Sequence, residues 1–209
     1  MSQQDAHINW HSFDPAIGHG LKHDPMKAIV APRPIAWIAS VNRVGQHNLA
    51  PYSFFNLVSA SPPLLIFSSD GSKDSLRNIK ETGEFTVNLV TQDNVASMNQ
   101  SSAFVAPEVD EFELAQVPWL ASDVVLARRV ASSPVNMECK LVEVKLLQDI
   151  HGQPCNASMV IGQIVRVHIH QHCLQDGLFS IVKAGTVARA GYASDYVAVD
   201  RVQEIVRPG

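Results

Sequence analysis

The sequence predicts a mainly β protein, an antiparallel β-barrel decorated by a few helices (α+β). Several segments show the alternation of half-buried strands, whereas helical periodicity is confined to two or three short stretches. One long strand also changes the face of its apolar side chains part-way, as barrel strands do at a β-bulge. A doubly wound dinucleotide-binding fold is disfavoured, because Gly-x-Gly-x-x-Gly is absent from the sequence.

The chain begins with a polar segment that precedes the first strand. Residues 1–27 are His-rich with little periodicity and are expected to form an arm over the body, so we place the domain at residues 28–209. Within the domain, Pro34–Val41 has the composition of a strand, and Asn42–Gly45 has that of the turn that ends it.

The next segments predict further strands and one helix. Asn48–Val58 is apolar and aromatic, and Pro63–Ser68 predicts a short buried strand. A helix is expected through about Glu81, capped by Ser72 and followed by Gly83. Phe85, Val87 and Leu89 then alternate with polar residues, which predicts a half-buried strand over Glu84–Thr91.

The second half of the domain predicts a short helix, a long loop and two long strands. The helix is expected within Gln92–Ala103, and Phe104–Ala131, with two prolines and clustered acids, is expected to form the loop. The strands are Pro134–Ile150 and Ser158–His170. The apolar phase of the first strand slips near Leu141–Val142, which predicts a β-bulge there.

Composition narrows the class of protein. Hydrophobic residues make up 46% and charged residues 17%, and 16 Lys+Arg against 20 Asp+Glu leave a net charge of −4. An ordered globular protein is therefore expected, and a nucleic-acid binder is disfavoured. No apolar run reaches the ~20 residues that span a bilayer, and no signal peptide is visible, so we expect a cytoplasmic protein without membrane contact. Three cysteines without Cys-x-x-Cys predict neither disulfides nor a zinc site.

The stretch Ser68–Ser75 has the features of a phosphate site. It follows a predicted buried strand and opens the predicted helix, where free N–H groups and the helix dipole attract anions. Side chains of Ser69, Ser72, Lys73 and Ser75 add donors. The order Gly-Lys-Ser/Thr of a Walker loop is missing. The alternative is an ordinary capped helix with a solvated lysine.

Two segments, Arg33–Ser40 and Asn48–Asn56, have the composition of a pocket for a planar heteroaromatic ring. Their apolar and small residues are Ala36, Trp37, Ala50, Pro51, Phe54 and Phe55, and their polar residues are Asn48 and Ser53. Each aromatic residue taken singly could equally belong to the core.

Four motifs in a fixed order resemble a known family. They are Arg33-Pro-x-Ala-Trp-Ile, Asn48-Leu-Ala-Pro-Tyr-Ser-x-Phe-Asn, Lys73-Asp-Ser-x-x-Asn-Ile and Thr82-Gly-Glu-Phe-x-Val-Asn88. Together they look like the flavin reductase-like, FMN-binding split-barrel family that includes flavoredoxin. The resemblance covers about residues 25 to 200. A later segment, Arg189-Ala190-Gly191-Tyr192, is similar to that family's Arg-x-Gly-Gly-x-x-Tyr, with Ala190 departing from the usual first glycine.

The resemblance implies a split β-barrel that binds FMN and forms a homodimer with FMN near the interface. It implies that the isoalloxazine ring is lined by Ala36, Trp37, Ile38, Asn48, Leu49, Ala50, Pro51, Ser53, Phe54 and Phe55. It implies that the phosphate is held by Ser68, Ser69, Lys73 and Ser75, with Ser72 and Asp74 at the helix start. The residues alone predict an aromatic phosphate without distinguishing FMN from another one.

Four more residues are candidates for the substrate side. Glu111 and Phe112 lie within the acidic segment Glu108–Glu113, and Arg189 and Tyr192 lie near the C-terminus. Their alternatives are a solvated loop, an interface salt bridge and a packed tyrosine.

The histidines are expected to bind no metal. His168, His170 and His172 alternate on a predicted strand, where successive imidazoles on one face lie ~6.6 Å apart. One ion needs closer ligands, so a solvated strand edge is expected there. His7, His11, His19 and His23 in the N-terminal arm are expected at the surface.

The function implied by the resemblance is that of an NAD(P)H-dependent flavin reductase or flavoredoxin-type oxidoreductase. A hydride would pass from the nicotinamide C4 to flavin N5 and the electrons onward to an unknown acceptor, such as a flavin-dependent partner enzyme. No catalytic side chain is expected, because the flavin carries the chemistry. The main alternative is a non-catalytic FMN carrier reduced by a partner. Two relatives by fold, a haem-binding barrel and a pyridoxamine phosphate oxidase-like enzyme, are less favoured by the motifs.

Overall fold

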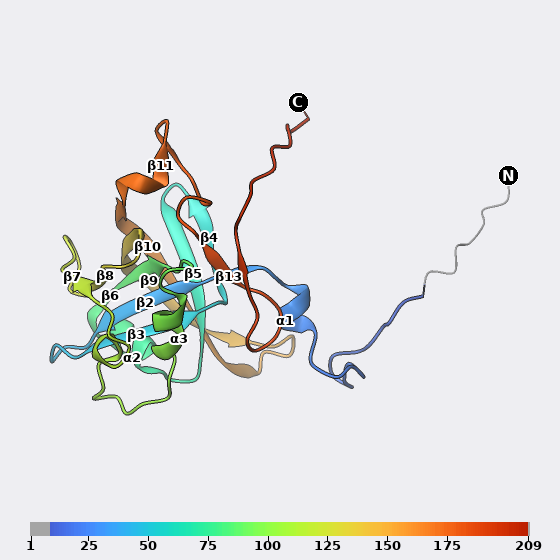
Figure 1. Cartoon of the computed structure of the whole chain (residues 1–209). Helices are drawn as coiled ribbons and strands as arrows, with labels where there is room; N and C mark the ends of the chain where they lie inside the picture. Colours follow the sequence, from blue (N-terminus) through green and yellow to red (C-terminus); the bar gives the residue numbers. More distant parts are fainter. Residues whose placement is uncertain (1–8, 209) are drawn as a thin grey trace.

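The fold is built on one seven-stranded antiparallel sheet with strand order β3-β2-β6-β9-β10-β5-β4 (Figure 1). The computed structural model describes residues 9–208, so the expectation for His7 lies outside the described residues. The strands of the sheet are β2 (Ala36–Val41), β3 (His47–Tyr52), β4 (Phe55–Ala60), β5 (Pro63–Asp70), β6 (Glu84–Leu89), β9 (Val135–Gln148) and β10 (Pro154–Ile169). The expected mainly β, antiparallel architecture is confirmed.

Smaller sheets and short helices surround this body. The small strands are β1 (Arg33–Pro34), β13 (Val187–Arg189) and β14 (Tyr196–Ala198) in one sheet, β7 (Trp119–Leu120) with β8 (Arg129–Val130), and β11 (Leu174–Gln175) with β12 (Leu178–Phe179). The helices are α1 (Met26–Ile29), α2 (Asp74–Thr82), α3 (Val95–Gln100), α4 (Glu111–Leu114) and the 3₁₀ helix η1 (Gln171–Cys173). None of the helices within residues 9–208 is both long and apolar enough to cross a membrane.

Strand β2 lies between two hydrophobic clusters, and all six of its residues are buried. Because side chains alternate along a strand, Trp37 and Ile38 point to opposite faces. Trp37 packs in a cluster with Leu49, Val90, Met98 and Phe112. Ile38 packs in a second cluster, which also contains Leu65, Phe67, Leu76, Ile79, Phe85 and Val87. The barrel wall at β2 is therefore covered on both sides.

The predicted β-bulge in β9 is confirmed. Ile161 of β10 pairs with Glu143, and Gly162 pairs with Leu141, so Val142 is the extra residue between them. Gly162 is required at this point, because a Cβ added there would lie 2.4 Å from Cζ of Phe85. The bulge explains why the apolar side chains of β9 change faces at Leu141–Val142.

Helix α2 forms where it was expected, but its start differs. The residue at its N-cap is Lys73, and no side chain caps the helix, so the prediction that Ser72 caps it was wrong. At the other end, Gly83 adopts a left-handed conformation with φ 73°, and its N–H donates to the carbonyl of Ile79 at 2.9 Å. Ile79 is buried against the barrel, which holds the helix start at the end of β5.

Two segments that were expected as single stretches contain separate secondary-structure elements. Asn48–Val58 comprises β3 and β4, joined through Ser53–Phe54, and Phe104–Ala131 contains α4, β7 and β8. The expected placement of three histidines on one strand was wrong. Strand β10 ends at Ile169, so only His168 lies on it, and the chain then turns into η1.

Candidate functional site

Three cavities meet at the end of β3, and Pro51 and Tyr52 line all three. The helix pocket, of about 370 Å³, lies at the start of α2. The Met98 pocket, of about 320 Å³, lies beside α3 and β14. The arginine pocket, of about 180 Å³, is formed around β1, β13 and the end of β5. The end of β3 is therefore the point at which ligands in these cavities would meet.

The helix pocket combines the first turn of α2 with residues of β3 and a following loop. It is lined by Asn48, Ala50, Pro51, Tyr52, Ser72, Lys73, Asp74, Ser75, Arg77, Ser101, Ser102, Ala103, Phe104, Val105, Pro107 and Glu111. The amide of Asn48 donates to Oγ of Ser75 at 2.8 Å, which ties β3 to the helix start. The first N–H groups of a helix have no intrahelical partner and attract anions. This pocket therefore offers an anion both a helix terminus and the Lys73 ammonium.

Two buried hydroxyls near this position have no hydrogen-bond partner. Tyr52 is 6% exposed and Ser69 is fully buried, yet neither Tyr52 Oη nor Ser69 Oγ is bonded. Burial raises the pKa of the Tyr52 phenol. Unbonded buried hydroxyls are costly. Tyr52 lines all three cavities, so its hydroxyl fits a ligand that brings acceptor oxygens, as a phosphate monoester does, whereas Ser69 lines none of them.

Glu111 places a buried carboxyl group on the same pocket. Its Oε2 accepts a hydrogen bond from the N–H of Leu49 at 3.0 Å, and burial raises its pKa above the ordinary range. Asp110 holds the short helix α4 in place, because it caps Phe112 N–H at 2.9 Å and pairs with Arg128 at 2.8 Å. Phe112 is 1% exposed and lies in the core rather than on the pocket.

The residues expected along a ring divide into two groups. Ala36, Trp37, Ile38 and Leu49 are fully buried in the core clusters or between them, and none lines the three cavities. Ala50, Pro51, Ser53 and Phe54 line one or more of the cavities, and Phe55 packs against the second core cluster. Ser68 lines the arginine pocket, whereas Ser72, Lys73, Asp74 and Ser75 line the helix pocket.

Trp37 nevertheless reaches the helix pocket through one partner. Its indole Nε1 donates to Oγ of Ser101 at 2.9 Å, and Ser101 lines that pocket. The Ser101 hydroxyl donates in turn to the carbonyl of Met98 at 2.8 Å. The indole therefore fixes the end of α3 and the loop that closes the pocket.

Arg189 and Tyr192 go to different places. Arg189 lines both the Met98 pocket and the arginine pocket, and its guanidinium lies 4.7 Å from the ring centroid of Tyr196. Tyr192 lines none of the three cavities, and its ring lies 5.7 Å from that of His23 in the N-terminal segment.

Sequence reasoning included Tyr52 only as part of the segment Asn48–Phe55 expected along the ring, without singling it out, and missed Tyr196. For Tyr52 a signal existed, because Asn48, Ala50 and Tyr52 share one face of β3. For Tyr196 there was none, since its position depends on pairing between β13 and β14 and on Arg189 stacking over its ring.

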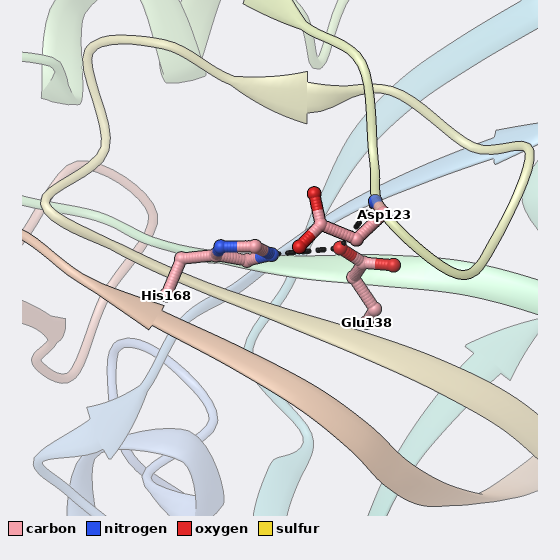
Figure 2. A group of neighbouring side chains, drawn as sticks. All are labelled: Asp123, Glu138 and His168. Carbon is pink, nitrogen blue, oxygen red and sulfur yellow. Dashed lines mark hydrogen bonds and ion pairs between the residues drawn. The ribbon is translucent and has the colours of Figure 1, made fainter.

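A polar cluster outside the cavities involves one of the predicted histidines (Figure 2). Glu138 is fully buried, and its carboxylate accepts hydrogen bonds from Asp123 N–H at 2.8 Å and Val124 N–H at 2.7 Å. His168 Nε2 lies 2.7 Å from the same carboxylate. Burial alone would raise the pKa of Glu138, but these hydrogen bonds lower it overall.

This cluster joins a loop to two strands of the main sheet. Ligand atoms of Asp123, Glu138 and His168 lie within 4.8 Å of one another, but Glu138 is fully hydrogen-bonded and Asp123 pairs with Arg166 at 3.0 Å. The carboxylate thus ties the loop before β8 to β9 and β10. The expectation of a solvated strand edge at His168 was wrong, because its imidazole contacts the buried Glu138 of the neighbouring strand, which is paired with Arg166 two residues earlier on β10. Sequence spacing gave no sign of this contact.

The profile of the flavin reductase like domain family matches residues 27–181. The chain belongs to the flavin reductase-like family. The resemblance carried by the four sequence motifs is therefore confirmed.

Relatives of this flavin reductase-like protein cover most of its length. An uncharacterized protein of Halalkalibacterium halodurans is 38% identical over 153 residues, which are 71% of this chain and 73% of the relative. Among solved structures, nitrilotriacetate monooxygenase component B from Bacillus cereus has a TM-score of 0.84 at 28% identity, covering 94% of this chain and 99% of that one. The 2-nitrobenzoate 2-nitroreductase from Pseudomonas fluorescens has a TM-score of 0.76 at 29% identity, covering 87% and 88%.

Proposed function

We propose that this flavin reductase-like protein is an FMN-dependent oxidoreductase reduced by NAD(P)H. The single observation that carries the proposal is the meeting of three cavities at Tyr52, one of them at a helix start with a lysine and the unbonded Tyr52 hydroxyl. A phosphate group and a planar ring need such adjoining compartments. Membership of the flavin reductase-like family supports flavin as the ligand.

The FMN phosphate would be held at the start of α2. Ser72, Lys73 and Ser75 line the helix pocket there, and Lys73 supplies the positive charge. The unbonded hydroxyl of Tyr52 would donate to an oxygen of the cofactor. Such charge-assisted contacts are stronger than neutral hydrogen bonds. Asn48 would keep the helix start and β3 in register through its bond to Ser75.

The isoalloxazine ring would lie against β3 and the β3–β4 connection. Ala50 and Pro51 allow close approach, and Phe54, which is 47% exposed, offers an apolar surface beside them. Trp37 and its buried neighbours in β2 would act from beneath, by holding the strand and Ser101 in place. The predicted ring contacts of Ala36, Ile38 and Leu49 are thus assigned a supporting position.

When bound, FMN supplies the two-electron chemistry of this site, with a hydride from the nicotinamide received at flavin N5. The protein binds and orients the two reactants and excludes water from the site. The proposal assigns no acid or base to its side chains. The Met98 pocket, whose lining includes Ile35, Met98 and Tyr196 beside polar residues such as Asn99 and Ser102, gives a second planar reactant a compartment adjoining Tyr52. The physiological electron acceptor follows from none of these residues, and a flavin-dependent partner enzyme is one class that fits.

A homodimer in the cytoplasm completes the proposal. Phe54 on the site and its neighbours Leu57 and Val58 on β4 are about half exposed. Strand β4 is also an edge of the main sheet, so a second copy would cover an apolar edge next to the cofactor. Light scattering on the purified protein tests this, and a monomer at micromolar concentration would contradict it.

A comparison of FMN with riboflavin tests the cofactor assignment. Riboflavin has the same ring and lacks the phosphate, so quenching of flavin fluorescence on titration reports the phosphate site directly. We expect one FMN per chain, bound at least about tenfold more tightly than riboflavin, as charge-assisted phosphate contacts require. Equal affinities would contradict the phosphate site, and no quenching by either flavin would contradict the whole assignment.

A further inference from the structure

The arginine pocket gathers four cationic side chains around about 180 Å³. They are Lys27 of α1, Arg33 of β1, Lys73 at the start of α2 and Arg189 of β13. One acidic residue, Asp70, also lines the cavity, and it is exposed to solvent. Within residues 9–208, none of the four cations forms an ion pair. The cavity therefore has a large excess of positive charge over its protein counter-charge.

Two of these cations are forced together by the sheet. Arg33 and Arg189 are directly paired residues of β1 and β13. Like charges opposite each other on neighbouring strands destabilise the pair. Gly191 keeps the segment close, because a Cβ added there would lie 2.8 Å from Cβ of Ala28 in α1. The fold thus maintains a repulsive arrangement through tight local packing.

Arg33 is the member whose burial points to a ligand. It is only 6% exposed, lines the cavity, and its Nε has no hydrogen-bond partner. Its Nη1 is occupied, since it donates to the carbonyls of Lys27 and Val30. Burial and the nearby Arg189 both lower the pKa of Arg33, which is the response of a cation lacking a counter-anion. A bound oxyanion would supply that missing partner.

We propose that the arginine pocket is a second anion subsite, next to the FMN phosphate site with which it shares Lys73, and that it takes the pyrophosphate of the nicotinamide dinucleotide. The inference rests on the proposed function. Arg189 Nη2 donates to the carbonyl of Ala193 at 2.9 Å, so the remaining N–H groups of Arg189 and the unpartnered Nε of Arg33 together would donate to the oxygens of a pyrophosphate. Arg189 and Ser53 line both this pocket and the Met98 pocket, so one dinucleotide would extend from the cationic compartment into the Met98 pocket.

The subsite is tested by calorimetric titration of the FMN-loaded protein with inorganic pyrophosphate. The variants are R189L and K27M, the second at an exposed residue of α1, and R201L in the exposed C-terminal tail is the matched control. We expect wild type and R201L to bind pyrophosphate equally. R189L should bind it about tenfold or more weakly and K27M a few-fold more weakly, each with unchanged FMN affinity. Pyrophosphate should also compete with NADH, so that the KM for NADH rises in R189L.

The outcomes separate this inference from the proposed function. If pyrophosphate does not bind to wild type while NADH still reduces bound FMN, the subsite is overturned and the function stands. If FMN affinity falls in parallel with pyrophosphate affinity in both variants, the pocket holds the FMN phosphate itself, which also overturns the proposal. If FMN does not bind at all, both proposals fail. Unchanged thermal unfolding of K27M keeps the test valid should R189L prove unstable.

Discussion

Replacing Lys73 by alanine should weaken FMN binding about tenfold while leaving the stability of the fold almost unchanged. Within residues 9–208 the Lys73 ammonium forms no ion pair, and it lies 6.0 Å from the ring centroid of Tyr52. A cation over an aromatic ring at an exposed site contributes about 0.5–1 kcal/mol, which is the most that unfolding should report. A hydrogen bond to a charged group contributes about 1.5–3 kcal/mol, and exposure to salt places Lys73 at the low end of that range. About 1.4 kcal/mol corresponds to a tenfold change in Kd.

The assay is a fluorescence titration of wild type, K73A and K80A with FMN and with riboflavin. Lys80 is an exposed lysine in the last turn of the same helix, so K80A controls for helix charge and stability. Only K73A should lose FMN affinity, none should lose riboflavin affinity, and the difference should shrink as salt rises. Identical FMN affinities in the three proteins would refute the phosphate site at α2, and an equal loss for riboflavin would show that Lys73 acts on the ring or the fold.

Three further changes test the fold around the site. W37A should lower the free energy of unfolding by about 3–5 kcal/mol, and should also weaken FMN binding because Ser101 loses its partner; stability that falls while FMN affinity holds would confine Trp37 to the core. E138Q should lower Tm at pH 7, since a carboxylate whose folded pKa is lowered stabilises above its unfolded pKa, and that stability disappears as pH falls through the folded pKa. An equal decrease of Tm with falling pH in E138Q and wild type would contradict this. G162A should lower the free energy of unfolding, measured by chemical denaturation, by about 1–3 kcal/mol, because its Cβ would clash with the Phe85 ring. An unchanged denaturation midpoint would disprove the close approach.

Local chemistry explains why part of the fold could be predicted. The bulge at Val142 left a phase change in the apolar pattern, and Gly83 marked the end of α2 through the left-handed conformation it adopts. The start of helix α2 after β5 could also be predicted, because a strand followed by Ser, Lys and Ser before a helical period is a local signal. The residue at the N-cap could not be predicted, because Ser72 and Lys73 are neighbours in sequence and no side chain makes a capping hydrogen bond.

Long-range contacts explain what the sequence could not indicate. Trp37 has a side chain of the kind that contacts a bound ring. Only the packing of β2 between two clusters shows that it is buried. The pairing of Arg33 with Arg189 joins segments at opposite ends of the domain, with no pattern in either to announce it. His168 was misassigned for the same reason, because its partner Glu138 lies across the β9–β10 pair rather than nearby in sequence.

The most direct test of the proposed function is the visible absorption spectrum of the FMN-loaded protein, recorded anaerobically before and after addition of NADH or NADPH. We predict a flavin band perturbed by the protein that bleaches within the mixing time of a stopped-flow experiment with one of the two nucleotides. A perturbed band that only dithionite bleaches would contradict the reductase and leave an FMN carrier reduced by a partner. A spectrum identical to that of free FMN would contradict the flavin site itself.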